Sequence, residues 1–342
     1  MELDTKTGGF YIPACCRSIF ALLEAGPIFL AFPSNIFMKF KQLEVSDYHK
    51  LKEFFKSQQY SLCNYSLLSL IVWSNQKLKS HYAVEDNTLI ICNRSAANPA
   101  DNHLILPMSS TDDITPEYLF LLAKRLCFSD YWFVPEDFLL KYDAKEIAFY
   151  FEVSEQDEFD DYIYLKQDLI QLKGNKYAKQ RNLIHQFSKR YLSRCKVDIE
   201  MIDSGNTREC LNFLQVWCEQ RKCDVDNCVS LACEKMATMN ALNNIDALEV
   251  KGILIRIDGA VSAFGISSHL TETMGVLNFE KANASIKGLY QFLDNECAKH
   301  LFTGYMYINK ESDMKLPNLA QSKKSYNPVR IVKSYRLKIN EK

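Results

Sequence analysis

Two apolar runs joined by Asp258-Gly259 constrain the fold of this chain more than any other feature of its sequence. Residues 252–257 and 261–267 are rich in Ile, Val and Phe, which favour strands. An Asp-Gly dipeptide between two such runs favours the tight turn of an antiparallel hairpin. Residues 273–279 predict a third strand. We therefore expect an antiparallel sheet in the C-terminal half.

Helical patterns alternate with strand patterns over the rest of the chain. Apolar residues recur at three- and four-residue steps in residues 47–58 and 208–220, which predicts two helices. Further helices are expected over residues 116–128, 231–242 and 288–301, and further strands over residues 89–92, 103–107, 147–153, 162–164, 305–308 and 329–337. The order helix, meander, helix, strand recurs in both halves, which raises a duplicated fold as a hypothesis. The expected class is α+β, with mixed, mostly antiparallel sheets flanked by helices.

The length of the chain favours two domains. Its 342 residues exceed one typical domain. The acidic segment 155–161 is the best candidate for a boundary between the domains. We therefore expect an N-terminal domain over residues 38–154 and a C-terminal domain over residues 161–342.

Residues 1–37 are expected to be an upstream extension or the product of a mistaken start, and to contribute little to the fold. The apolar part of this segment is interrupted by Glu24, Pro27 and Pro33, whereas a membrane-spanning helix must satisfy every backbone group. No transmembrane segment is therefore expected. Met38 begins a segment that looks like a natural protein start.

Charge and cysteine usage narrow the class of protein. The formal net charge is −1, so recognition of an anion must come from local patches. The 12 cysteines are scattered and form no C-x-x-C pair, which is typical of a reducing compartment such as the cytoplasm and predicts no metal site. The sequence contains no Ser-His-Asp arrangement, no H-E-x-x-H and no G-x-x-x-x-G-K-[ST] motif. Hydrolase and nucleotide-kinase functions therefore have no motif support.

A basic helix is expected from Gly174 to about Tyr191. Its polar face carries Asn175, Lys179, Asn182, Gln186 and Lys189, at steps of four and three. Free backbone N–H groups at the helix entry add to the lysines as donors to an anion. The alternative interpretation is a solvated surface helix.

Two strand-end loops carry the candidate chemistry. In the first loop a strand ends near Glu280 and a helix begins near Lys287 and Gly288, which is a geometry that holds phosphate on the amides of a helix start. Acyl-CoA-dependent N-acetyltransferases hold a pyrophosphate in this way, but their signature needs more glycine than the single Gly288. The second loop follows the strand near Ile308, and Lys323 and Tyr326 come shortly after it.

Three carboxylates in these loops are the candidate general bases or amine-orienting groups, namely Glu280, Glu311 and Asp313. Polar groups directly after a strand are commonly functional, because the strand end holds the loop rigidly at a cleft. For the second loop, a charged turn that caps the following helix is an equally good interpretation.

Three ordered segments of the chain resemble the phosphatidylglycerol lysyltransferase C-terminal-like family, many of whose bacterial members are labelled only as domains of unknown function. The segments are residues 162–182, 280–290 and 308–328, and the resemblance covers roughly residue 40 to the C-terminus. It implies two tandem N-acetyltransferase-like (GNAT-like) domains. It also implies transfer of an aminoacyl group from aminoacyl-tRNA to a lipid head group or a peptidoglycan precursor.

The resemblance implies that the three carboxylates line an acceptor cleft, and that the basic helix contacts phosphate. The candidate substrate- or phosphate-binding residues are Lys176, Lys179, Arg181, Asn182, Lys287, Gly288, Asn309, Lys310, Lys323 and Tyr326.

The chain departs from the family pattern in the third segment. Relatives commonly read Asn-Arg-Glu-Glu-Asp-Leu-Gly where this chain reads Asn-Lys-Glu-Ser-Asp-Met-Lys, with Lys310, Ser312 and Lys315 at the changed polar positions. They also carry basic residues where Ala320 and Gln321 stand. Lysine in place of arginine removes bidentate anion binding. We therefore expect a different substrate, or a change in activity itself.

Three functions follow from these observations. The first is an aminoacyl or acyl transferase, with aminoacyl-tRNA as the donor and no certain cofactor. The second is an N-acyltransferase that uses acyl-CoA. The third is a non-catalytic module that binds an anionic ligand. The expected partners are tRNA or an anionic small molecule, with peripheral contact to lipid head groups, and the oligomeric state stays open.

Overall fold

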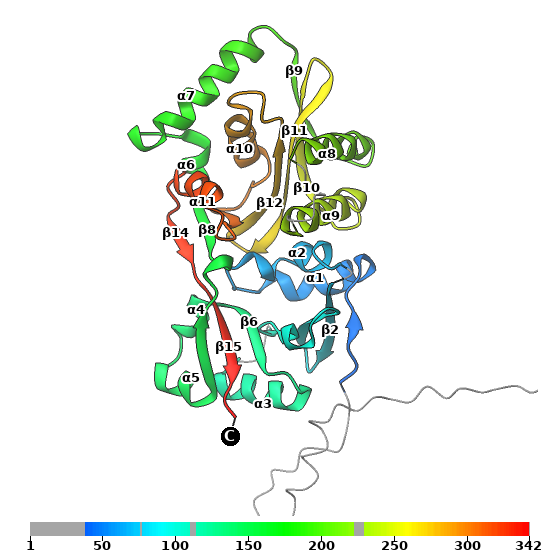
Figure 1. Ribbon diagram of the computed structural model, residues 1–342, viewed down its shortest axis with the longest axis vertical. Helices are drawn as coiled ribbons and strands as arrows, with labels where there is room; N and C mark the ends of the chain where they lie inside the picture. Colours follow the sequence, from blue (N-terminus) through cyan, green and yellow to red (C-terminus); the bar gives the residue numbers. More distant parts are fainter. Residues whose placement is uncertain (1–37, 76, 110–113, 222–228, 342) are drawn as a thin grey trace, which may run out of the picture.

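The computed structural model describes residues 38–75, 77–109, 114–221 and 229–341. Its secondary structure forms two sheets, one in each half of an elongated molecule (Figure 1). The described residues do not include the segment 1–37, Cys223 or Cys228. The expectations for the N-terminal extension and for these two cysteines therefore lie outside the described residues.

The first sheet comprises eight strands within the described residues, in the order β1-β2-β3-β4-β6-β15-β7 with β5 paired to β3. Its strands are β1 Lys41–Gln42, β2 Leu78–Glu85, β3 Thr88–Ser95, β4 His103–Leu104, β5 Met108–Ser109, β6 Asp130–Pro135, β7 Phe151–Glu155 and β15 Ser334–Ile339. The helices of this half are α1 Tyr48–Lys56, α2 Leu67–Val72, α3 Pro116–Leu126, α4 Glu136–Leu139 and α5 Ala144–Tyr150. Only the β4–β6 pair is parallel among these paired strands.

The second sheet has seven strands in the described part of the chain, in the order β14-β8-β13-β12-β11-β10-β9. Its strands are β8 Asp161–Leu165, β9 Val197–Met201, β10 Lys251–Ile257, β11 Ala260–Thr271, β12 Met274–Ala282, β13 Tyr307–Ser312 and β14 Arg330–Val332. The helices are α6 Lys166–Gln171, α7 Ala178–Phe187, α8 Thr207–Arg221, α9 Val229–Asn243, α10 Leu289–His300 and α11 Pro317–Lys324. The β12–β13 pair is parallel.

The two faces of the second sheet pack against different helices. Leu277, on one face, packs with Leu293 of α10, and α6 and α7 lie beside α10. Val276, on the opposite face, belongs to a core that also contains Leu214 of α8 and Leu70 of α2. The same core continues into the first sheet, so apolar packing joins the two halves.

One strand of the second half in sequence belongs to the sheet of the first half. Strand β8, at the start of the second half, pairs with β13 and β14 of the second sheet. Strand β15 follows every strand of the second sheet in the sequence, yet it pairs with β6 and β7 of the first sheet. We call this arrangement the strand exchange. The domain boundary proposed at residues 155–161 assigns residues 334–339 to the C-terminal domain, whereas these residues complete the first sheet.

The expected hairpin and fold class are confirmed. Strands β10 and β11 are antiparallel, and Asp258 and Gly259 between them have φ values of 50° and 84°, as a type I′ turn requires. Both sheets are mixed and mostly antiparallel, with flanking helices. The helix predicted over residues 116–128 is α3, and the Thr115 side chain accepts a hydrogen bond from Tyr118 N, as an N-cap does.

Two of the predicted strands were wrong. Residues 147–150 of the strand expected over 147–153 belong to helix α5, because the Asp143 side chain accepts a hydrogen bond from Lys145 N and caps that helix. The strand begins only at Phe151. The strand expected over 329–337 is divided at Lys333 into β14 and β15, which belong to different sheets.

Candidate active site

The candidate site lies where the parallel strands β12 and β13 separate. Their pairing covers only three residue pairs, the last being Val276 with Asn309. Beyond this point β12 continues beside β11, while β13 continues beside β8. Asn278 forms a bulge in β12, because Phe279 and Leu277 pair with adjacent residues of β11. Charged side chains of both strands gather beyond the point of separation.

Lys310 of β13 is the centre of a buried ionic cluster. Its Nζ lies 2.6 Å from Asp294 Oδ1 and 3.1 Å from Glu280 Oε2. The ring centroid of Tyr326 is 4.9 Å from Nζ, within the range of a cation–π contact. Burial favours the neutral amine, but the two carboxylates outweigh it and raise the pKa of Lys310. The cluster therefore holds a permanent buried cation between two acids.

Glu280 has one carboxylate oxygen without a partner. Its Oε2 faces Lys310, whereas Oε1 is buried and has no hydrogen-bond partner within the described residues, and the same holds for Asp294 Oδ2. Burial raises the pKa of Glu280 to about 6, and the Lys310 charge opposes that rise. An ionised carboxylate with a free acceptor oxygen can receive a proton from an amine or a hydroxyl.

Glu311 is a second, partly buried acid, and its pKa is raised further than that of Glu280. Its Oε1 accepts a hydrogen bond of 3.2 Å from Asn278 Nδ2, and burial raises its pKa to about 8. Lys323 Nζ donates to the backbone carbonyl of Lys310 and, at 3.1 Å, to that of Glu311. Burial lowers the pKa of Lys323. Burial therefore favours the protonated form of Glu311, and the charge of Lys323 opposes this effect.

Asn309 fixes Glu311 and ties the site to the first half of the chain. Its Oδ1 accepts from Glu311 N at 2.6 Å, and Glu311 has a φ of 58°, which is rare for a side-chain-bearing residue. Asn309 Nδ2 donates to Ser61 O at 2.9 Å and to Asp161 Oδ2 at 2.8 Å. The same Asp161 oxygen accepts from Cys63 N at 2.6 Å. We call this network, whose members Asn309, Asp161 and Ser61 are buried, the Asn309 anchor.

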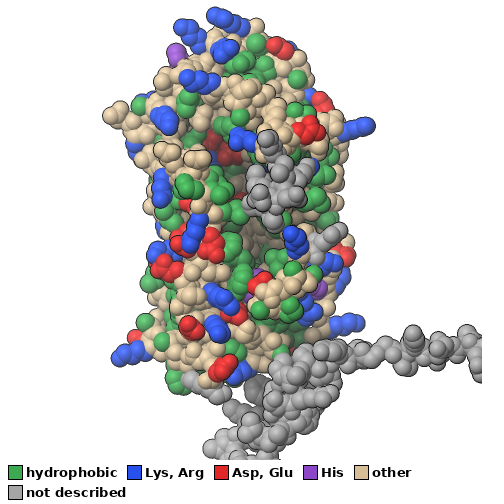
Figure 2. Space-filling view, viewed as in Figure 1, with side chains coloured by type: hydrophobic (Ala, Val, Ile, Leu, Met, Phe, Trp, Pro, Cys, Tyr) green, Lys and Arg blue, Asp and Glu red, His purple; other side chains and the backbone are tan. Residues whose placement is uncertain are grey.

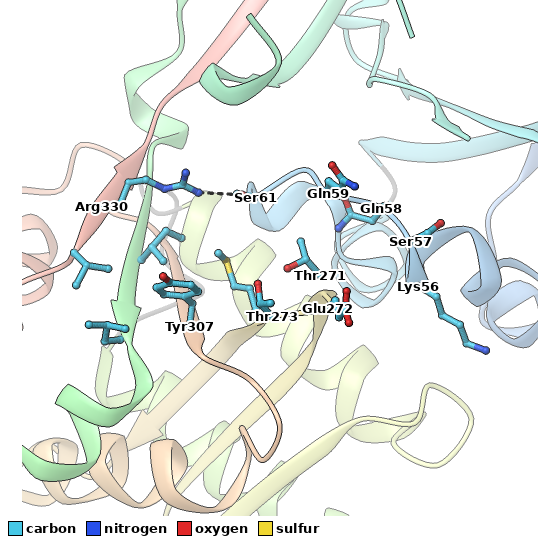
Figure 3. Close-up of a pocket in the computed structure, with 14 residues that line it drawn as sticks. Lys56, Ser57, Gln58, Gln59, Ser61, Thr271, Glu272, Thr273, Tyr307 and Arg330 are labelled. Carbon is cyan, nitrogen blue, oxygen red and sulfur yellow. Dashed lines mark hydrogen bonds between the residues drawn. The ribbon is translucent and has the colours of Figure 1, made fainter. Parts of the chain in front are cut away.

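A pocket of about 610 Å³ adjoins the Asn309 anchor (Figure 3). Residues 56–59 and Ser61 of the first half line it together with residues of β8, β13, β14 and the β11–β12 turn. Arg330 points toward Ser61 in Figure 3, and its Nη2 donates to Ser61 Oγ at 3.1 Å. The pocket has the size of a small-molecule site.

Some polar residues of the basic helix and its entry form contacts within the protein, and others are exposed to solvent. Lys176 Nζ lies 3.1 Å from Asp168 Oδ2. Arg181 Nη1 donates to the carbonyls of Leu172 and Gly174, and so holds the turn before the helix. Lys179 and Asn182 are exposed. Lys and Arg side chains gather at the top of the molecule in Figure 2, where α7 lies in Figure 1.

The remaining predicted residues lie outside the cluster around Lys310. Asp313 Oδ2 accepts a 2.6 Å hydrogen bond from Tyr162 OH, and its Oδ1 accepts one from Lys315 N. Lys287 is exposed. Gly288, with a φ of 85°, is buried against the carbonyl of Leu183, where a Cβ has no room. Helix α7 therefore covers the start of α10 on this side.

A comparison with protein families shows to which family the chain belongs. The model of the family "Phosphatidylglycerol lysyltransferase, C-terminal" matches residues 134–338. The chain belongs to this family. Its kind of function is therefore that of an acyl or aminoacyl transferase. No curated protein matches the chain.

Several solved structures are similar to this lysyltransferase-family chain. A conserved protein of unknown function from Bacteroides thetaiotaomicron VPI-5482 is 25% identical, with a TM-score of 0.79 over 89% of this chain and 100% of that one. The C-terminal DUF2156 domain of a lysylphosphatidylglycerol synthetase candidate from Agrobacterium fabrum is 12% identical, with a TM-score of 0.58 over 85% and 91% of the two chains. A tandem GNAT protein from the clavulanic acid biosynthesis pathway is 8% identical, with a TM-score of 0.43 over 88% and 98%.

The expected fold class is confirmed, with two tandem α+β units whose mixed, mostly antiparallel sheets are flanked by helices. In the part of this family member that the structure describes, no helix has the length and apolar character needed to cross a membrane.

Sequence reasoning missed two residues of the site in this lysyltransferase-family chain. Asp294 lies on α10, 3% exposed, among Leu293 and other buried side chains. An acid at a position where the helical period calls for an apolar residue was the available signal. Asn278 is equally buried, but nothing in a single sequence distinguishes a bulge residue from an ordinary strand residue.

Replacing Glu311 with glutamine is expected to change the pH dependence of stability. The folded-state pKa of Glu311, about 8, lies above its ordinary value of 4.5, so the folded protein binds the extra proton. This contribution to the free energy of unfolding is fully present below pH 4.5 and is lost as the pH rises through 8. E311Q should therefore gain stability relative to the wild type between pH 5 and pH 9. Urea unfolding at several pH values measures the difference.

The exposed Glu53 of α1 offers a matched control for that experiment. The variant E53Q should keep a constant difference from the wild type over the same pH range. If the free energy of unfolding of E311Q ran parallel to that of the wild type between pH 5 and pH 9, the Glu311 carboxyl would be ionised over this whole range.

Proposed function

We propose that this chain moves an activated aminoacyl group from an ester donor to an amine or hydroxyl acceptor. The observation that carries the proposal is Glu280, a partly buried carboxylate that is held by Lys310 and has a buried oxygen without a partner, at the separation of β12 and β13. Family membership supports the same kind of reaction.

The two raised pKa values divide the roles of the two glutamates. Glu280, with a pKa of about 6, is the proposed general base, and Glu311, with a pKa of about 8, is the proposed general acid. Glu280 takes the proton of the acceptor as its nitrogen or oxygen attacks the ester carbonyl carbon. The tetrahedral intermediate then collapses, the ester C–O bond breaks, and Glu311 gives its proton to the leaving oxygen. Lys323 interacts electrostatically with both carboxyls, and its charge opposes the charge that develops.

We propose aminoacyl-tRNA as the donor in preference to acyl-CoA. A pyrophosphate bound in the acyl-CoA manner needs open backbone amides at the start of α10. That start carries Gly288, which is buried against α7. The exposed cations Lys179 and Lys287 instead suit a long polyanion on the surface.

The pocket of about 610 Å³ is the proposed entry of the acceptor, because it lies between the halves and shares Ser61 with the Asn309 anchor. A lipid head group or a cell-wall precursor has the required amine or hydroxyl, and either acceptor places the protein at the membrane periphery. No step of this proposal needs a cofactor beyond the donor.

Transfer and binding assays with charged tRNA test the proposed reaction. E280Q should slow acyl transfer roughly 10²–10⁴-fold, as expected for loss of a general base, whereas E53Q should keep the wild-type rate. Binding of aminoacyl-tRNA should weaken steeply with salt, and Lys287→Met should reduce the logarithmic salt slope by roughly one. The assignment of the donor would be refuted if tRNA binding were the same with and without the aminoacyl group and at every salt concentration. Calorimetric binding of an acyl-CoA thioester would also refute it.

A further inference from the structure

A second, smaller pocket lies between α7, α10 and α11. Its volume is about 170 Å³, roughly that of five or six water molecules in the liquid. Four carboxamides line it, namely Gln180, Gln291, Asn318 and Gln321, together with the side chains of Ser322 and Ser325. Lys179 is the single cation in the lining. The wall is therefore almost wholly made of groups that both donate and accept hydrogen bonds.

Gln180 is the residue that marks this pocket as a binding site. It is 2% exposed, and its Nε2 donates to Ser325 O at 2.7 Å and to Ser325 Oγ at 3.1 Å. Its Oε1 is buried and has no partner within the residues that the structure describes. A buried acceptor without a partner destabilises the folded protein. A ligand hydroxyl or N–H in the pocket would remove that destabilisation.

Tyr326 connects this pocket with the ionic cluster. The residue is buried and lines the pocket, and its ring centroid lies 4.9 Å from Lys310 Nζ. Apart from Tyr326 and Leu183, the lining offers no apolar surface. A flat aromatic ligand would find few partners here, whereas a ligand rich in hydroxyl groups would find many.

We propose that this pocket binds a monosaccharide unit that carries one phosphate. Carboxamides match neighbouring hydroxyl groups, because each supplies a donor and an acceptor side by side. Gln180 Oε1 accepts from one sugar hydroxyl, and Lys179 at the rim binds the phosphate. The volume admits one sugar ring or less, so any further part of a larger molecule lies outside the pocket. The site does not depend on the transferase reaction.

Calorimetry on the full chain with ribose 5-phosphate tests this proposal. We expect saturable binding of ribose 5-phosphate, and binding at least roughly tenfold weaker for ribose and for inorganic phosphate, because each lacks one set of hydrogen bonds. Calorimetry with AMP shows whether the sugar-phosphate unit comes from a free sugar phosphate or from a nucleotide. An affinity for AMP equal to that for ribose 5-phosphate indicates a free sugar phosphate, and a higher affinity for AMP indicates a nucleotide. Both results support a sugar-phosphate pocket.

Three variants locate the binding. Lys179→Met should weaken ribose 5-phosphate about tenfold, the effect of one lost charge-assisted hydrogen bond. Lys189→Met, an exposed position beyond the pocket lining, should leave the affinity unchanged. Gln291→Ala should also weaken binding, and it avoids the structural hydrogen bonds of Gln180. The proposal fails if the folded protein binds no ribose 5-phosphate, or if neither Lys179→Met nor Gln291→Ala changes its affinity.

Discussion

Lys310→Met is expected to lower the free energy of unfolding by about 3–5 kcal/mol. The substitution keeps an unbranched side chain but removes the cation that lies 2.6 Å from Asp294 and 3.1 Å from Glu280. Two acids would then share a buried site with no opposing charge on that side. Urea unfolding followed by circular dichroism at pH 7 measures the loss.

Lys315→Met is the matched control for this prediction. Its Nζ lies 2.6 Å from Asp157 Oδ1, but both side chains are more than half exposed. An exposed pair contributes only about 0–1 kcal/mol. Equal losses in the two variants would show that the Lys310 pairs are no stronger than a surface pair. Adding Asp294→Asn to Lys310→Met should recover part of the stability, because it removes one of the unpaired acids.

Deleting residues 334–342 is expected to cost about 5 kcal/mol or more, which is the whole stability of many domains. Strand β15 lies between β6 and β7, so its loss breaks two ladders and leaves β7 without its partner strand. Leu337 on this strand is fully buried, and burial of one such side chain contributes about 1.5–3 kcal/mol. Hydrogen exchange should show lost protection first in β6 and β7.

A chain that lacks only residues 341 and 342 provides the control, since these residues lie beyond β15. It should unfold like the full chain. A peptide of residues 334–342 added to the truncated chain should restore protection in β6 and β7. Unchanged protection in the truncated chain would show that the first sheet does not need this strand.

Local patterns predicted those parts of the fold that depend on neighbours in the sequence. The Asp258-Gly259 turn specifies its own hairpin, and Thr115 caps α3 by itself. Residues 147–153 show the limit, since a short apolar alternation fits one turn of helix as well as a strand. The position of β15 had no local signal, because the identity of its partner strands depends on how the two halves meet.

The candidate site was predicted in part for the same reason. Glu280, Lys310 and Glu311 stand at strand ends, where polar residues in sequence already suggest a cleft. Their division into an ion pair and an acid with a raised pKa depends on Asp294 and Asn278, which come from other parts of the chain. The basic helix was recognised as cationic, but the engagement of Arg181 with carbonyls before the helix is a tertiary detail that no helical period encodes.

The strand exchange has a consequence for the order of events during protein synthesis. The first half leaves the ribosome long before residues 334–339 are synthesised. Until then, β6 and β7 of the nascent first sheet lack their common partner strand, β15. Domains usually fold as units as they emerge, but this one is completed only after every strand of the second sheet has been made. Until then its unpaired strand edges are exposed to other chains, and this protein is expected to need more protection from nascent-chain chaperones than its length alone suggests.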